Sequence, residues 1–224
     1  MSLASNSGES VLTLSPRLYA ILDADAATSA GWTLIDLASA CLAGGAGFLQ
    51  LRAKNAASGW LLDTAADLVQ RARPSGAIVI VNDRADIARL AGADGVHLGQ
   101  DDLAPAGART VLGEGAIVGL STHTPEQIEA ALAQPISYLA IGPVFSTATK
   151  ATGYEAVGLE RVRYASDRAR TRQLPLVAIG GITVESAPAV IEAGADAVAV
   201  IGDLLSTGDP ERRVRAYVER LARM

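Results

Sequence analysis

Short apolar runs alternate with amphipathic segments along most of the chain. Runs this short and this uniformly apolar are typical of strands that are covered on both faces, as in parallel sheets. We expect strands at residues 18–22, 48–52, 77–81, 95–98, 117–121, 138–141, 176–179 and 197–201. The segments between and after them favour helices at residues 33–43, 64–73, 85–91, 105–112, 125–133, 159–168, 184–193 and 209–224.

The regular alternation predicts the fold. A strand begins roughly every 26 residues, which fits a compact (β/α)8 TIM barrel, an α/β fold. The phrases GAGFLQL, GADGVHL and GADAVAV recur where a helix would end and a strand would start. An open doubly wound sheet is the alternative, but no G-x-G-x-x-G pattern follows the first strand. We therefore expect one TIM-barrel catalytic domain over residues 17–224, preceded by a flexible tail over residues 1–16.

The composition argues against several other classes of protein. Half of the 224 residues are apolar, and the net charge is −5 without any basic run, so we expect no nucleic-acid partner. Cys41 is the single cysteine, which excludes an internal disulfide and a cysteine-rich zinc site. No apolar run approaches the roughly 18 residues that cross a bilayer, and residues 1–16 lack the features of a signal peptide. A cytoplasmic protein without a membrane partner is predicted, and a homo-oligomer is left open.

Charged residues gather where the second, third and fourth strands end, and catalytic groups of a barrel lie at those ends. Arg52 and Lys54 could hold a phosphate or pyrophosphate; alternatively, Arg52 is structural and paired with an acid of a neighbouring strand. Asn82 and Asp83 follow the third strand and Asp102 follows the fourth. The Asn82–Asp83 pair could cap a helix or provide a ligand for a hard cation, and acids on two neighbouring strands make Mg2+ plausible here. The sequence therefore predicts a Mg2+–pyrophosphate site at this side of the barrel mouth.

The remaining strand ends point to a second anion site. Paired glycines after the seventh strand and Gly202 after the eighth let backbone N–H groups approach a phosphate. The run TATK after the sixth strand adds hydroxyls and a lysine, although such loops are also common without function. Ser121 could contact a substrate ring, and His123 could be a base or a turn residue. His97 is expected to point into the barrel or pack against helices.

Several of these phrases together resemble one known family. QLRAK, VNDRADIARLAGADGVHLGQDDL, GLSTHT, GPVFSTATK, AIGGIT and GADAVAVI are similar, in this order, to thiamine-phosphate synthases, and the likeness runs from about Leu18 to about Tyr217. The resemblance implies a transferase of thiamine biosynthesis. Such enzymes join 4-amino-2-methyl-5-pyrimidinylmethyl diphosphate to a thiazole phosphate, giving thiamine phosphate and pyrophosphate in a Mg2+-dependent dissociative substitution. The implied partners are these two small-molecule substrates.

The resemblance also implies roles for individual residues. Arg52, Lys54 and Lys150 would bind the diphosphate and neutralise it as it leaves, and are the expected catalytic residues. Asp83 and Asp102 would hold Mg2+. The other substrate-binding residues would be Gln50, Asn82 and Ser121 for the pyrimidine diphosphate, and Thr147, Thr149, Gly181, Ile201 and Gly202 for the thiazole phosphate.

The chain departs from the family pattern at three positions, which leave the implied class of enzyme intact. Gly202 stands where the family usually has Ser, Ala53 where it often has Glu, and Ser146 where Pro is common. Ala53 also counts against a thiazole tautomerase, which would need a Glu near the second strand. A thiazole tautomerase shares the barrel and the phrases AIGGIT and GADAVAV, but it typically lacks the second acid cluster and the T-x-T-K run present here. A non-catalytic phosphate-binding barrel would not need the charges at strands two to four. A phosphosugar isomerase would need a clear base at a strand end, and none is evident.

Overall fold

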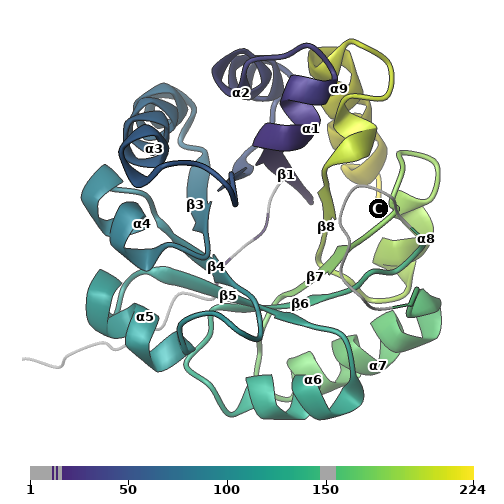
Figure 1. Ribbon diagram of the computed structural model, residues 1–224. Helices are drawn as coiled ribbons and strands as arrows, with labels where there is room; N and C mark the ends of the chain where they lie inside the picture. The colour runs from purple at the N-terminus through teal and green to yellow at the C-terminus, as the bar shows by residue number, and fades with distance from the viewer. Residues whose placement is uncertain (1–11, 13, 15–16, 147–154) are drawn as a thin grey trace, which may run out of the picture.

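The computed structural model describes residues 12, 14, 17–146 and 155–224. In these residues, eight parallel strands close into one barrel in chain order, with β1 paired to both β2 and β8. The strands are β1 (Leu18–Asp23), β2 (Phe48–Arg52), β3 (Ile78–Asn82), β4 (Gly95–Leu98), β5 (Ile117–Thr122), β6 (Tyr138–Ile141), β7 (Leu176–Ile179) and β8 (Ala197–Val200). Figure 1 shows the helices as a ring outside these strands. The predicted (β/α)8 barrel is confirmed.

The helices follow the strands in the order that the sequence predicts, with additions. They are α1 (Ala24–Ser29), α2 (Leu34–Ala43), α3 (Ser58–Ala72), α4 (Ala85–Ala91), α5 (Pro105–Leu112), α6 (Pro125–Leu132), α7 (Gly158–Arg170), α8 (Ala187–Glu192) and α9 (Pro210–Leu221). Two 3-10 turns, η1 (Arg73–Ser75) and η2 (Gly202–Leu204), complete the described elements. The side chains of Thr33, Thr124 and Asp209 cap α2, α6 and α9, as their positions in the sequence indicate.

Helix boundaries differ from the prediction where local signals are weak. Helix α1 was not predicted; Asp23, the last residue of β1, caps it by accepting a hydrogen bond from the Ala26 N–H at 2.9 Å. Helix α3 begins at Ser58 rather than residue 64, and no side chain caps its start. Helix α8 begins at Ala187 rather than residue 184, because Thr183 and Ser186 bond to each other's backbone N–H and form a turn first.

Two apolar layers hold the barrel together. Leu18, Leu49 and Val79 alternate with inward-facing neighbours and pack against the surrounding helices. Tyr19 and Phe48 face the interior, where their rings stack with centroids 3.8 Å apart. This two-sided burial explains why the strands read as continuous apolar runs.

Tyr138 fills the middle of the barrel because the strand beside it carries a glycine. Tyr138 is fully buried, and it faces Gly119 across the β5–β6 pairing. A Cβ atom at Gly119 would lie 2.0 Å from Cζ of Tyr138, so any other residue there would collide with the ring. The glycine thus makes room for a tyrosine hydroxyl in the barrel interior.

The start and end of the described chain add two observations. Leu14, which falls in the predicted tail, is buried against the barrel interior, while most of residues 1–16 lie outside the described residues. In the described part of the chain, no helix combines the length and the apolar character that spanning a membrane requires.

Candidate active site

A charged cluster lies where β1 to β4 end. Arg52, the last residue of β2, forms an ion pair with Asp23 at the end of β1. Lys54 Nζ lies 3.4 Å from Asp83 Oδ2. Asp83 in turn contacts the carboxyl group of Asp102. The structure therefore brings together the four charged residues predicted here, and it contains the ion pair expected of a structural arginine.

One atom of Arg52 points to an occupant of this cluster. Its Nε atom is buried and finds no hydrogen-bond acceptor among the described residues. Leaving a buried charged donor unpaired costs free energy, so such an atom calls for an explanation. An anionic oxygen bound at the mouth of the barrel would supply the missing acceptor.

Asp83 and Asp102 are arranged as a pair of carboxylates rather than as helix caps. Neither caps the helix that follows it, since the N-cap positions of α4 and α5 are Arg84 and Ala104. Asp83 adopts a left-handed backbone with φ of 63°, and Asp102 accepts a hydrogen bond from the Gly99 N–H at 2.7 Å. Burial, and then the contact with Asp102, raises the pKa of Asp83. Two neighbouring carboxylates repel each other when both are charged, and a cation between them would offset this repulsion.

The donor set at this pair fits a hard divalent cation. The described residues contain no group of three or more His, Cys, Asp or Glu side chains that could hold a metal ion. Two carboxylates are nevertheless a usual protein contribution to Mg2+, which takes its other ligands from phosphate oxygens and water. Asp83 and Asp102 therefore fit Mg2+ together with a phosphorylated ligand.

A chain of hydrogen bonds crosses the barrel interior beside this cluster. Gln50 Nε2 donates to the Tyr19 hydroxyl at 2.7 Å, which lies 3.1 Å from the Tyr138 hydroxyl. The Tyr138 hydroxyl is 2.8 Å from His97 Nδ1, and His97 Nε2 is 2.8 Å from Ser121 Oγ. Gln50 and Ser121, both predicted to bind substrate, are thus the two ends of one buried network. His97 points into the barrel, one of the two positions expected for it.

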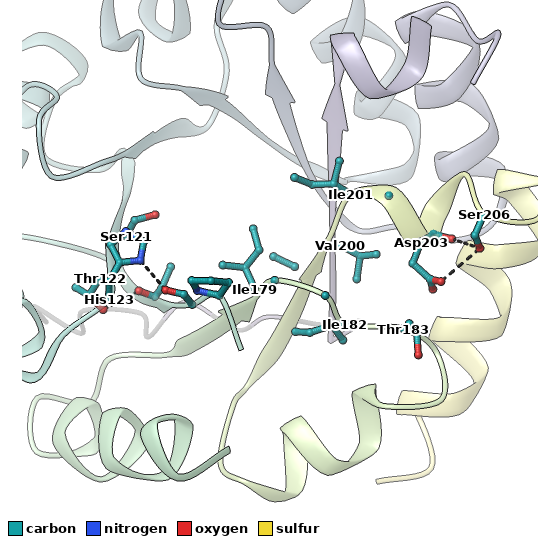
Figure 2. A pocket seen from close by; sticks show the side chains of 17 residues that line it. Ser121, Thr122, His123, Ile179, Ile182, Thr183, Val200, Ile201, Asp203 and Ser206 are labelled. Atoms are coloured by element: carbon teal, nitrogen blue, oxygen red, sulfur yellow. Dashed lines mark hydrogen bonds between the residues drawn. The ribbon is translucent and has the colours of Figure 1, made fainter. Parts of the chain in front are cut away.

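A cavity of about 250 Å3 opens on the opposite side of the mouth. Figure 2 shows it between the end of β5 and the loops that follow β7 and β8. It is lined by residues 121–123, 140, 142–143, 179–183, 199–203 and 206. Four predicted substrate-binding residues, Ser121, Gly181, Ile201 and Gly202, line this one cavity.

The cavity wall depends on two glycines after β7. Gly180 and Gly181 have positive φ values of 106° and 62°, a region that side chains disfavour. A Cβ atom at Gly180 would lie 2.4 Å from Pro143 Cβ, and one at Gly181 would lie 2.6 Å from the Ser146 carbonyl oxygen. The backbone is thus bare at the edge of the cavity, as a phosphate-binding loop requires.

The remaining predicted residues lie near the cluster or the cavity, or fall outside the described residues. Asn82 ends β3 beside His97 of β4, on the inward face. His123 lines the cavity, with Nδ1 2.5 Å from the Gly142 carbonyl oxygen (Figure 2). Thr147, Thr149 and Lys150 lie outside the described residues.

Sequence reasoning missed three residues in or next to the site. Asp23 pairs with Arg52, and an acid directly after an apolar strand was the available signal. The hydroxyl of Tyr138 had no such signal, because the residue sits inside an apolar strand. Asp203 lines the cavity after β8 and was given no role.

Comparison with known proteins decides the family. The model of the TMP-TENI family, described as thiamine monophosphate synthase, matches residues 18–204. The chain belongs to this family. A thiamine-phosphate synthase of Koribacter versatilis is 47% identical over 208 residues, which cover 92% of this chain and 96% of that protein. A thiamine-phosphate synthase of Thermus thermophilus is 43% identical over 194 residues, 85% of this chain and 92% of the relative.

A solved structure agrees with these relatives. The thiamine phosphate pyrophosphorylase from Pyrococcus furiosus superposes with a TM-score of 0.82 at 29% identity, covering 92% of this chain and 96% of that one. The thiamine-phosphate synthase activity predicted from the sequence, a transferase reaction of thiamine biosynthesis, is thereby confirmed. In this family member the charged cluster and the cavity occupy one barrel mouth.

Proposed function

We propose that the two halves of the barrel mouth bind the two substrates of a thiamine-phosphate synthase. The β2–β4 side would take 4-amino-2-methyl-5-pyrimidinylmethyl diphosphate, and the cavity at β5–β8 would take the thiazole phosphate. The observation that carries this division is that the two sides of the mouth offer different groups to a ligand. Cations and a carboxylate pair lie on one side, and bare glycine backbone lies on the other.

The diphosphate half rests on charge. Arg52 Nε would donate to a diphosphate oxygen, which would satisfy its buried N–H. Lys54, now 3.4 Å from Asp83, would contact the same group, and Lys150 would join them. Asp83 and Asp102 would hold Mg2+, which, when bound, would supply positive charge against the diphosphate.

The pyrimidine would lie over the buried network. Gln50 and Ser121 stand at its two ends, and Asn82 faces inward beside His97. A fixed network holds these side chains in one rotamer, so they are preorganised to hydrogen-bond a heteroaromatic ring. Gln50 and Ser121 are both buried, so a ring placed over them would meet polar groups that are shielded from water.

On the side of the mouth proposed for the thiazole phosphate, backbone N–H groups would bind the phosphate. Gly181 and the Ile201–Gly202 backbone line the cavity and would hold the thiazole phosphate, with Thr147 and Thr149 as further contacts. Gly202 lacks the hydroxyl that the family usually has, so the phosphate would rely on N–H groups at this position.

The reaction needs a leaving group to be neutralised and an acceptor to be aligned. The methylene carbon–oxygen bond breaks and its electron pair departs with pyrophosphate, leaving a cation that the pyrimidine amino group stabilises. The thiazole nitrogen then donates its lone pair to form the carbon–nitrogen bond. Arg52, Lys54 and Lys150 stabilise the departing charge, and binding in adjoining halves aligns the acceptor. The attacking nitrogen carries no proton, so no general base is needed.

The proposed function also implies which partners the protein has and where it works. The partners would be the two small-molecule substrates, and the enzyme would work in the cytoplasm without nucleic acid or membrane. The acidic net charge of −5 and the absence of a basic run support this view.

A condensation assay tests the proposed function. The protein, both substrates and Mg2+ would be mixed, and thiamine phosphate would be measured after oxidation to its fluorescent product. We expect product with Mg2+, no product with EDTA, and recovery when Mg2+ is added back. Product formation that is unaffected by EDTA would overturn the metal assignment. Absence of product from folded protein would favour a tautomerase or a binding role.

A further inference from the structure

Beside the cavity lies a polar cluster that the proposed reaction does not use. Asp203 accepts hydrogen bonds from Arg213 Nε at 3.0 Å and Nη2 at 2.9 Å. The Tyr217 hydroxyl lies 2.6 Å from Asp203 Oδ2 and 3.2 Å from the Ile182 carbonyl oxygen. The Val184 N–H also donates to Asp203, at 3.3 Å. The carboxylate of Asp203 thus connects η2 to the loop after β7 and to helix α9.

These contacts join the two loops proposed to bind phosphate. Ile182 and Val184 belong to the loop after β7, Asp203 belongs to η2 after β8, and Arg213 and Tyr217 belong to α9. Tyr217 is fully buried, and the side chains of Asp203 and Arg213 are only 11% and 16% exposed. Buried, multiply bonded side chains fix the distance between the elements that carry them.

The charge of Asp203 gives the cluster a second consequence. Asp203 lines the same cavity as Gly181 and Gly202 (Figure 2). A bare carboxylate beside a phosphate would repel it. None of the described residues that line the cavity is Lys or Arg. Arg213, behind Asp203, is the cation that offsets this charge, and its Nη2 also lies 3.4 Å from the exposed carboxylate of Glu185.

We propose that Asp203, Arg213 and Tyr217 form a clamp that positions the β7 and β8 loops for the phosphate of the acceptor substrate and neutralises Asp203. The inference rests on the proposed function, and it makes these three positioning residues rather than catalytic ones. Affinity for the acceptor substrate depends on the clamp, whereas affinity for the pyrimidine diphosphate does not.

Steady-state kinetics on variants of Arg213 and Asp203 test the clamp. Arg213→Met leaves the carboxylate uncompensated, Asp203→Asn removes its charge, and the double variant removes both charges. Arg215→Met is the matched control, since Arg215 lies on the exposed side of α9 and pairs with Glu211 at 2.6 Å. For each variant, kcat and the KM for both substrates are measured, together with the binding of thiazole phosphate and of inorganic phosphate by calorimetry.

The expected pattern separates the clamp from a purely structural role. Arg213→Met should raise the KM for thiazole phosphate about tenfold or more, because one uncompensated charge then faces the phosphate. The KM for the pyrimidine diphosphate should stay within about twofold, and the double variant should recover much of the lost affinity, because the repelling charge is gone. Arg215→Met should match the wild type. Equal changes in both KM values, or no recovery in the double variant, would overturn the clamp.

The calorimetry keeps this test independent of the proposed function. Wild-type protein that binds both phosphate probes but forms no thiamine phosphate would contradict the proposed function alone, and the clamp would still be judged by how the variants change phosphate binding. Unchanged phosphate binding in Arg213→Met would overturn the clamp whatever the activity. Arg213→Lys, which keeps the charge and loses the paired hydrogen bonds, should lie between wild type and Arg213→Met.

Discussion

At the scale of single residues, neighbouring side chains fix the orientation of the polar groups in the site. The ion pair with Asp23 orients Arg52. Hydrogen bonds through Tyr19, Tyr138 and His97 connect Gln50 to Ser121. Such preorganised donors are effective because they need no rearrangement when charge develops. The consequences can be tested one side chain at a time.

Arg52→Lys should cost activity although it preserves the positive charge. Lysine has no Nε donor and cannot bond Asp23 and a diphosphate with the same rigid geometry, so we expect kcat/KM for the pyrimidine diphosphate to fall by about 100-fold. Arg71→Lys is the control, since Arg71 forms an exposed pair with Asp67 on α3. Equal activity of Arg52→Lys and wild type, measured by steady-state kinetics, would contradict the role of Nε.

Tyr138→Phe should weaken the fold and pyrimidine binding together. Removing the hydroxyl deprives Tyr19 and His97 of a buried partner, so the free energy of unfolding should fall by about 1–3 kcal/mol. The KM for the pyrimidine diphosphate should rise because Ser121 loses its fixed orientation. Urea denaturation and kinetics are the measurements. Tyr164→Phe, at a 38% exposed tyrosine, should change neither, and an equally small effect at Tyr138 would refute the network's role.

At the scale of elements, the strands were predictable and the helix starts less so. Every predicted strand lies within one residue of its observed bounds, because two-sided burial imposes an unbroken apolar run. Helix α3 extends six residues before its predicted start, since Ser58 and Gly59 carry no strong helix signal and packing decides the boundary. Helix α1 is six residues long and gave no periodic pattern.

Gly119→Ala tests the packing of β5 against β6. Its Cβ would lie 2.0 Å from Cζ of the fully buried Tyr138, so strand or ring must move, and we expect a loss of about 3 kcal/mol in the free energy of unfolding. Gly115→Ala provides the control, because no heavy atom lies within 4 Å of a Cβ placed there. Chemical denaturation of both variants compares the two; similar stabilities would contradict the packing described.

At the scale of the whole molecule, the parallel arrangement of the strands around the barrel creates the site. Asp23 and Arg52 end the paired strands β1 and β2, and Asp83 and Asp102 follow the paired strands β3 and β4, so all four lie at the same rim. The sequence indicated which strand ends carry charge, and the resemblance supplied their roles. The sequence could not indicate the inward contacts of the Tyr138 hydroxyl, which depend on side chains meeting inside the closed barrel. Nor could it indicate the contacts of Asp203, which depend on how α9 and the loop after β7 pack beside η2.

The buried cysteine and tyrosine side chains also predict how the stability of the fold responds to alkali. Burial raises the pKa of Cys41 to about 12 and raises the pKa values of Tyr19, Tyr138 and Tyr217 above their usual value. The unfolded chain releases these protons at pH values of about 8.5 for cysteine and about 10 for tyrosine, whereas the folded chain retains them.

Stability should therefore be full below pH about 8 and fall as the pH rises towards 11. Thermal unfolding followed between pH 7 and pH 11 measures this, and Cys41→Ala should make the fall between pH 8 and pH 9.5 shallower. A melting temperature that stays constant or rises over this interval would contradict the burial of these groups.

Calorimetric binding of pyrophosphate, the proposed product, with Mg2+ or with EDTA tests the proposed metal site directly. Wild-type protein should bind pyrophosphate at least tenfold more tightly with Mg2+, and Asp83→Asn and Asp102→Asn should lose this difference. Asp86→Asn, at an exposed carboxylate paired with Arg84, should behave as wild type. Equal affinity with Mg2+ and with EDTA, or an undiminished Mg2+ effect in both active-site variants, would contradict the assignment of Asp83 and Asp102 as Mg2+ ligands.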